Sequence, residues 1–348
     1  MMKFTKSAAG YTKVKFMNHG EVVKVDSIKK YFDVGGKFRF SRKYLKAVDD
    51  ISFSIKEGET LSLVGESGCG KTTIGRLILR LIEPTAGSVF FMGKDLLQLD
   101  QEQMRNTRRE MRIIFQNPFA SLNPRKTVEQ ILSQPYRIHE NFSTGKGLRQ
   151  KVYELMETVG LTPQSLYIDR YPHEFSGGQR QRIGIARAIA LNPKFIVADE
   201  PVSALDMSVR AQILNLMKDL QARFGLTYLF ITHDLSVVRS ISTQVMVMYL
   251  GKLVEFTPVK EIFDNPKHPY TKALLSATPI PNPRKARERQ RIILKGEIPS
   301  PVDPPSGCRF HPRCSECLPI CSKEVPPRIN LGRRDDEIHE VSCWLYKG

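Results

Sequence analysis

Apolar residues along the chain recur with two spacings, and the segments that show them alternate. Short apolar runs predict strands at residues 22–32, 51–55, 60–64, 195–198 and 227–232. Apolar residues at helical spacing predict helices at residues 71–82, 148–159, 180–190 and 209–220. Gly225 is a suitable end for the last of these helices. Strands that alternate with helices favour an α/β fold built on a parallel sheet.

Composition narrows the class of protein. Of the 348 residues, 41% are hydrophobic, which excludes a disordered or fibrous chain. The net charge of +17 indicates an anionic partner, which can be nucleotide phosphates, nucleic acid or an acidic membrane face. No apolar run approaches the ~18 residues of a membrane-spanning helix, and the N-terminal residues lack the apolar core of a signal peptide. We therefore expect a protein that stays in the cytoplasm.

Residues 65–72, Gly-Glu-Ser-Gly-Cys-Gly-Lys-Thr, match the phosphate-binding pattern G-x-x-x-x-G-K-[ST] between a predicted strand and a predicted helix. The glycines let backbone N–H groups surround a β-phosphate at the start of the helix. Lys71 would reach the β- and γ-phosphates, and the Thr72 hydroxyl would bind Mg²⁺. We expect nucleotide binding by Gly65, Glu66, Ser67, Gly68, Cys69, Gly70, Lys71, Thr72 and Thr73.

Two further predicted strands end in polar residues that suit phosphate chemistry. Residues 195–198 run into Asp199, which is placed to hold Mg²⁺ through water, and Glu200, which is placed to polarise the attacking water. His233 follows residues 227–232. Because ligands collect at this edge of an α/β sheet, we assign His233 the role of a γ-phosphate sensor.

A second anion site precedes another predicted helix. The segment Phe-Ser-Gly-Gly-Gln at residues 175–179 offers a serine hydroxyl and two glycine N–H groups at the start of that helix. One active site does not need two phosphate cradles on one chain. They make sense if the cradle of one subunit closes over the ATP held by another. The residues of this signature site are Ser176, Gly177, Gly178 and Gln179.

Together these motifs resemble the ABC transporter ATPase family over residues 22–255. The resemblance implies an ABC-type P-loop ATPase with a RecA-like parallel-sheet core, an antiparallel β subdomain and a helical subdomain at about residues 117–192. It also implies ATP and Mg²⁺ as cofactors, with Mg²⁺ bound through Thr72, Gln116 and Asp199.

The same resemblance assigns roles to further residues. Gln116 matches the Q-loop, which senses Mg²⁺ and the transmembrane partner. Ser203 and Asp206 match the D-loop that crosses the dimer interface. Phe32, or its neighbour Tyr31, matches the aromatic residue that stacks on adenine. The catalytic set is then Gln116, Glu200 and His233.

The rest of the chain narrows the family. Residues 265–279 and 299–314 are similar to the C-terminal signature of oligopeptide, dipeptide and nickel importer ATPases, and residues 120–125 and 199–206 to the second of their two paired ATPases. The resemblance implies a heterodimer with a homologous ATPase, two transmembrane permease subunits and an extracytoplasmic peptide-binding protein. The chain would act peripherally at the cytoplasmic face of the membrane and drive uptake of di- or oligopeptides. Nickel import is the alternative.

Five of the six cysteines lie near the C-terminus. In a reducing cytoplasm such a group indicates metal binding before disulfides, although disulfides or free thiols remain an alternative. Four thiolates are enough for a [4Fe–4S] cluster or a tetrahedral zinc ion. Their spacing along the sequence does not distinguish the two, because Cys317 could compete as a ligand. The resemblance favours the cluster, with the ligands Cys308, Cys314, Cys321 and Cys343.

These motifs divide the chain into an N-terminal extension (1–21), an ABC ATPase domain (22–255) and a C-terminal module (256–348). The main rival function is a nucleic-acid-linked ABC ATPase, which the charge and the cysteines would suit. A single phosphate loop, the short interval between Gly65 and Ser176, and cysteines that follow the cassette oppose it. We therefore expect no nucleic-acid partner. A simple phosphoryl-transfer kinase would not need the Ser176 cradle.

Overall fold

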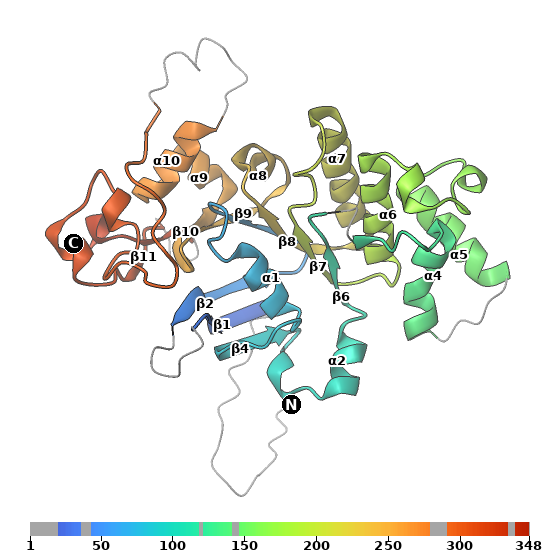
Figure 1. Ribbon diagram of the computed structural model, residues 1–348, viewed down its shortest axis with the longest axis horizontal. Coiled ribbons are helices and arrows are strands. Elements are labelled where there is room, and N and C mark those ends of the chain that lie inside the picture. Colours follow the sequence, from blue (N-terminus) through green and yellow to red (C-terminus); the bar gives the residue numbers. More distant parts are fainter. Residues whose placement is uncertain are drawn as a thin grey trace, which may run out of the picture.

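The computed structural model describes residues 20–35, 43–117, 121–140, 146–278, 291–332 and 338–347 (Figure 1). The expected N-terminal extension lies almost wholly outside these residues. Within them, no helix combines the length and the apolar character needed to span a membrane.

An eight-stranded sheet runs through the described part of the chain in the order β11-β12-β10-β9-β3-β8-β7-β6. Strands β9, β3, β8, β7 and β6 are parallel, and β10, β12 and β11 continue the sheet in antiparallel pairs. The predicted α/β fold with a parallel sheet is thus confirmed for the centre of the sheet. Its strands are β3 (Thr60–Val64), β6 (Met111–Ile114), β7 (Phe195–Asp199), β8 (Thr227–Thr232), β9 (Gln244–Tyr249), β10 (Lys252–Pro258), β11 (Arg328–Asn330) and β12 (Glu340–Ser342).

The central strands are mostly apolar because other elements cover both of their faces. Every residue of β3, β7 and β8 is buried, which is typical of parallel strands in the middle of a sheet. A smaller antiparallel sheet has the order β2-β1-β4-β5. Its strands are β1 (Glu21–Asp33), β2 (Tyr44–Lys56), β4 (Ala86–Phe91) and β5 (Lys94–Asp95).

Helices fill the connections between the strands (Figure 1). Their order along the chain is α1 (Lys71–Ile78), α2 (Gln101–Thr107), α4 (Val128–His139), α5 (Lys146–Thr158), α6 (Gly177–Ile189), α7 (Met207–Phe224), α8 (Leu235–Ile241), α9 (Val259–Asp264) and α10 (Pro269–Ala277). Gly225 ends α7 in the left-handed conformation, as predicted.

The sequence predicts a helix that ends at residue 82, but α1 ends at Ile78. Arg80 then takes a positive φ of 47°, and its Nη1 donates hydrogen bonds to the carbonyl oxygens of Leu96 and Leu99, each at 2.7 Å. These contacts hold the chain after α1 against the turn that follows β5.

Alternate residues of β7 face two different layers. Phe195 and Val197 belong to the apolar cluster that contains α1 and the smaller sheet, whereas Ile196 and Ala198 pack with α4, α5, α6 and α7. Since successive side chains of a strand point to opposite faces, the two sets of elements cover opposite faces of the larger sheet. Helices α1 and α6 therefore lie on opposite faces.

The C-terminal part of the chain is built into the same sheet, since β12 pairs with β10. Glu255 of β10 is fully buried, and its carboxylate accepts hydrogen bonds from the backbone N–H groups of Lys267 (2.8 Å) and His268 (2.9 Å) and from His339 Nε2 (2.9 Å). Burial alone would raise the pKa of Glu255, but these bonds hold it below its ordinary value. The domain boundary predicted at residue 255 falls inside β10.

His268 makes the docking of this region sensitive to pH. It is buried, its Nδ1 accepts a hydrogen bond from the backbone N–H of Tyr270 at 3.1 Å, and burial lowers its pKa to about 4. The unfolded chain, with an ordinary histidine pKa near 6.5, therefore binds a proton that the folded state excludes. The contribution of His268 to the free energy of unfolding is fully present above pH ~6.5 and is lost as the pH decreases towards ~4.

We expect the free energy of unfolding of the wild type to decrease by about 2 kcal/mol between pH 7 and pH 5 because of His268. His268→Asn keeps a side-chain acceptor for the Tyr270 amide and does not titrate, so the decrease should be smaller by that amount. Urea denaturation of both proteins at the two pH values measures the difference. Equal decreases in the two proteins would contradict the assignment.

Candidate active site

The phosphate loop connects β3 to α1, and two of its glycines leave no room for a side chain. Gly65 and Gly70 have φ angles of 156° and 107°. A Cβ atom on Gly65 would lie 2.3 Å from the carbonyl oxygen of Met248 in β9, and one on Gly70 would lie 2.1 Å from that of Ala47 in β2. The loop is thus wedged between both sheets, in a conformation whose N–H groups can surround an anion.

Lys71 and Thr72 begin α1 beside the tip of β7. Lys71 is 6% exposed, and its Nζ donates to the carbonyl oxygens of Gly65 (2.7 Å) and Glu66 (2.9 Å). The Thr72 hydroxyl donates to Asp199 Oδ1 at 3.0 Å. Burial raises the pKa of Asp199, and the neighbouring Glu200 raises it further. A hydroxyl and a carboxylate are hard oxygen donors, so this pair fits Mg²⁺.

Glu200 brings together the three residues of the predicted catalytic set. Its carboxylate oxygen Oε2 accepts a hydrogen bond from Gln116 Nε2 at 3.0 Å and lies 3.2 Å from His233 Nδ1. Glu200 is held by its own backbone, whose N–H donates to the carbonyl oxygen of Ile231 at 2.9 Å in the adjacent strand. Gln116 thus contacts Glu200 rather than Thr72 and Asp199, the other residues predicted to bind Mg²⁺.

The predicted signature residues form the start of α6. The backbone N–H of Gln179 donates to Ser176 Oγ at 3.3 Å, and the backbone N–H of Ser176 donates to Gln179 Oε1 at 3.0 Å. This capping box leaves Ser176 exposed at the positive end of the helix. A Cβ atom on Gly178 would lie 2.5 Å from Val209 Cγ1, so α6 packs closely on α7.

The other predicted site residues fall on the loop after Glu200 and at the end of β1. Ser203 Oγ donates to the Glu200 carbonyl at 3.0 Å, and Asp206 caps α7 by accepting from the backbone N–H of Val209 at 2.9 Å. Phe32 is 37% exposed, and Lys30 Nζ lies over its ring at 5.0 Å from the centroid, whereas the Tyr31 hydroxyl donates a hydrogen bond to Asp49. The choice between Phe32 and Tyr31 as the aromatic residue for adenine stays a prediction.

Comparison with known proteins identifies the family. Residues 48–203 match the family model of ABC transporters, and residues 254–321 match that of the oligopeptide/dipeptide transporter C-terminal region. The oligopeptide transport ATP-binding protein AppF of Bacillus subtilis is 52% identical over 331 residues, which cover 94% of this chain and 98% of AppF. The chain belongs to the family of ATP-binding subunits of oligopeptide/dipeptide ABC transporters.

Further relatives agree with this family. The dipeptide transport ATP-binding protein DppF of Escherichia coli is 51% identical over 88% of this chain and 90% of its own length. The dimeric structure of MJ0796, a bacterial ABC transporter cassette, superposes with a TM-score of 0.60 at 29% identity, over 68% of this chain and 98% of that one. The predicted ABC-type P-loop ATPase fold, with ATP hydrolysis coupled to transport, is confirmed.

The cysteines of the family's C-terminal region lie near one another. The backbone N–H of Cys308 donates to the Cys321 carbonyl at 2.8 Å. Burial, and to a lesser extent the neighbouring cysteines, raises the pKa of Cys308 to about 12 and that of Cys314 to about 11. In the described part of the chain, however, no three histidine, cysteine, aspartate or glutamate side chains are arranged to hold a metal ion. The described residues therefore give no support to the predicted metal-binding module.

Two residues of the same region reach the phosphate loop, which the sequence did not predict. The Tyr270 hydroxyl accepts a hydrogen bond from the backbone N–H of Glu66 at 2.9 Å. Arg313 donates to both carboxylate oxygens of Glu66, at 2.8 and 3.2 Å. Both residues lie in segments that carry the C-terminal signature, but no local pattern connects these segments with the loop.

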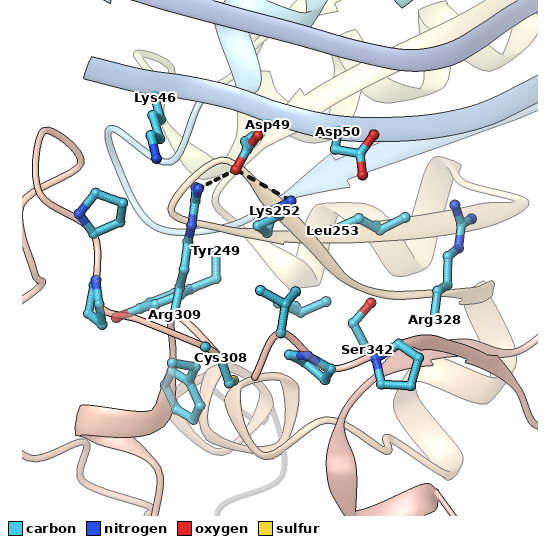
Figure 2. Close-up of a pocket in the computed structure, with 18 of the residues that line it drawn as sticks. Lys46, Asp49, Asp50, Tyr249, Lys252, Leu253, Cys308, Arg309, Arg328 and Ser342 are labelled. Carbon is cyan, nitrogen blue, oxygen red and sulfur yellow. Dashed lines mark hydrogen bonds and ion pairs between the residues drawn. The ribbon is translucent and has the colours of Figure 1, made fainter. Parts of the chain in front are cut away.

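A separate ion pair anchors the C-terminal part of the chain, from residue 254 onwards and called the tail below, to β2. It lies in a cavity of about 620 Å³ between β2, β10 and the tail, where Arg309 and Lys252 both point at Asp49 (Figure 2). Arg309 is hydrogen-bonded to Asp49, and Lys252 Nζ lies 3.4 Å away from it. Burial alone would raise the pKa of Asp49, but the Tyr31 hydroxyl and these two cations hold it below its ordinary value.

We expect Gly70→Ala to abolish the native shape of the phosphate loop, because its Cβ would overlap the Ala47 carbonyl. ATP affinity should fall at least about tenfold, a loss of about 1.4 kcal/mol. Gly225→Ala is the matched control: it also has a positive φ, of 63°, but its Cβ meets no atom within 4 Å. It should cost only about 1 kcal/mol of stability and leave ATP affinity unchanged. Equal affinities in the two variants would contradict the packing argument.

Proposed function

We propose that this chain hydrolyses ATP with Glu200 as the residue that polarises the attacking water. The observation that carries the proposal is the meeting of Gln116 and His233 at one oxygen of the Glu200 carboxylate. An amide and an imidazole at this position orient the carboxylate and can respond to a γ-phosphate beside it. The phosphate loop and Lys71 bind the polyphosphate. Thr72 and Asp199 hold Mg²⁺, which neutralises charge on the phosphates.

Ser176 and the N–H groups that follow it serve the nucleotide of a second subunit. The signature residues begin α6, which lies on the face of the sheet opposite to α1 and its phosphate loop, and this arrangement supports the role. We propose a paired homologous ATPase as that subunit, so that two ATP molecules are enclosed in a heterodimer. Ser203 and Asp206 lie on the loop that would meet the partner.

Transport follows from closure of that dimer. ATP binding draws the two ATPases together, two permease subunits follow the movement, and hydrolysis reverses it. The relatives named for oligopeptide and dipeptide transport support peptides as the cargo, delivered by an extracytoplasmic binding protein. The chain would then work at the cytoplasmic face of the membrane as a peripheral subunit.

The tail is proposed to hold a [4Fe–4S] cluster. The donor set suits it, because Cys314, Cys321 and Cys343 lie near enough to Cys308 to contribute to its raised pKa, and soft thiolates are the ligands that iron–sulfur clusters take. No electron transfer is required for ATP-driven transport, so the group would supply folding energy to the tail.

Glu200→Gln should leave ATP binding intact and lower turnover roughly 10²–10⁴-fold, because it removes the basic carboxylate but keeps the phosphate loop. The variant should accumulate as an ATP-bound closed dimer. ATP hydrolysis by the assembled transporter, together with nucleotide binding, measures both effects. Glu102→Gln, on the exposed surface of α2, is the matched control. Turnover near that of the wild type in Glu200→Gln would show that another group acts as the base.

Protein prepared without oxygen should contain about four irons per chain. Cys314→Ser should lose the iron and destabilise the tail, whereas Cys317→Ser, at an exposed cysteine outside the proposed set, should keep it. Elemental analysis of the three proteins decides the point. Stoichiometric zinc without iron would replace the cluster by a zinc site, and absence of both metals would leave free thiols.

A further inference from the structure

Glu66, the second residue of the phosphate loop, is held at three points. Its backbone N–H donates to the Tyr270 hydroxyl, its carbonyl accepts from Lys71 Nζ, and its carboxylate receives the two hydrogen bonds of Arg313. Two of the three partners belong to the family's C-terminal region, residues 254–321. Lys71, which is proposed to bind phosphate, therefore contacts the same residue, Glu66, as the tail does.

These tail residues are themselves rigidly placed. Tyr270 is fully buried, and its ring lies 4.8 Å from that of Tyr249 and 5.4 Å from that of Phe310, between ring centroids. The Arg313 side chain is only 8% exposed and also lies over the Tyr249 ring, at 5.9 Å. A buried bidentate arginine loses little freedom on binding a carboxylate, so it can fix the position of its partner.

The tail also lines a second side of the loop. Residues 298–301 face loop residues 66–69 across a cavity of about 270 Å³. The carbonyl oxygen of Pro301 accepts a hydrogen bond from the backbone N–H of Lys46 at 3.1 Å, next to the Ala47 carbonyl that packs on Gly70. The start and the end of the loop are thus both in reach of the tail.

We propose that Arg313 and Tyr270 are positioning residues that set the phosphate loop for nucleotide binding through Glu66. The inference rests on the proposed role of Lys71 and deepens it. Neither residue touches the nucleotide; they hold the peptide whose carbonyl Lys71 contacts, and so keep the lysine and the following N–H groups aimed at the phosphates. Coupling of this kind is reciprocal, so bound nucleotide must in turn hold the tail more firmly.

The test compares two arginines of the tail in the full chain. Arg313→Met breaks the contact with Glu66, and ATP affinity should fall roughly tenfold, a value within the range measured for coupled residues. Arg309→Met is the matched control, since Arg309 is as buried, but its hydrogen bonds go to Asp49 and the Leu250 carbonyl. It should lower tail stability with little change in ATP affinity. Equal losses of affinity would overturn the inference.

A double-mutant cycle separates positioning from a general loss of stability. If Arg313 acts through Glu66, ATP affinity in the double variant Glu66→Gln with Arg313→Met should be no weaker than in the poorer single variant. Additive losses would overturn the inference. Arg313→Lys keeps the charge and should restore part of the affinity; should Arg313→Met not fold, Glu66→Gln with Arg313→Lys completes the same cycle.

Hydrogen exchange gives the reciprocal measurement. ATP should slow amide exchange in residues 308–314 of the wild type and not in Arg313→Met. The variant Lys71→Ala distinguishes a failure of the proposed nucleotide site from a failure of the proposed role of the tail. If Lys71→Ala keeps its ATP affinity, the proposed nucleotide site is wrong. If it loses affinity while Arg313→Met and Glu66→Gln do not, only the role of the tail is wrong.

Discussion

The packing of two glycines against backbone carbonyls is the constraint on which the site depends. Gly65 is pressed against β9 and Gly70 against β2, so the phosphate loop can take its shape only when the two sheets are already in place. The loop also places two of the groups proposed to bind phosphate and Mg²⁺: Lys71 begins α1, and Thr72 reaches Asp199 from the next position. A small shift between the sheets would move all of these groups together.

Charge is distributed around the loop in a way that suits a metal nucleotide. Asp199 and Glu200 are adjacent carboxylates, and burial, with a smaller contribution from the neighbouring Glu200, raises the pKa of Asp199. Lys71 meanwhile rests on two carbonyl oxygens. In the proposed site, Mg²⁺ would offset the charge of these carboxylates, and a phosphate would offer Lys71 an anionic partner in place of neutral carbonyl oxygens.

The sequence predicted the parts of the site whose residues are neighbours along the chain. The loop at residues 65–72 and the acidic end of β7 are dense local patterns, and β3 and β8 are short apolar runs with the predicted ends. The strands β11 and β12 have three residues each, too few for an alternation to show. Contacts such as that of Arg313 with Glu66 join residues far apart in the chain, and only the folded structure reveals them.

The order of strands in the larger sheet has a consequence for synthesis. Strand β12 comes from the last residues of the chain, yet it covers the edge of β10, next to the strand whose backbone packs on Gly65. A growing chain cannot close this edge before residues 340–342 have left the ribosome. An open strand edge is a template for pairing with other chains, so the nascent protein is exposed to aggregation from the synthesis of β10 until that of β12. Truncation before residue 340 would remove β12 and leave this edge of β10 open.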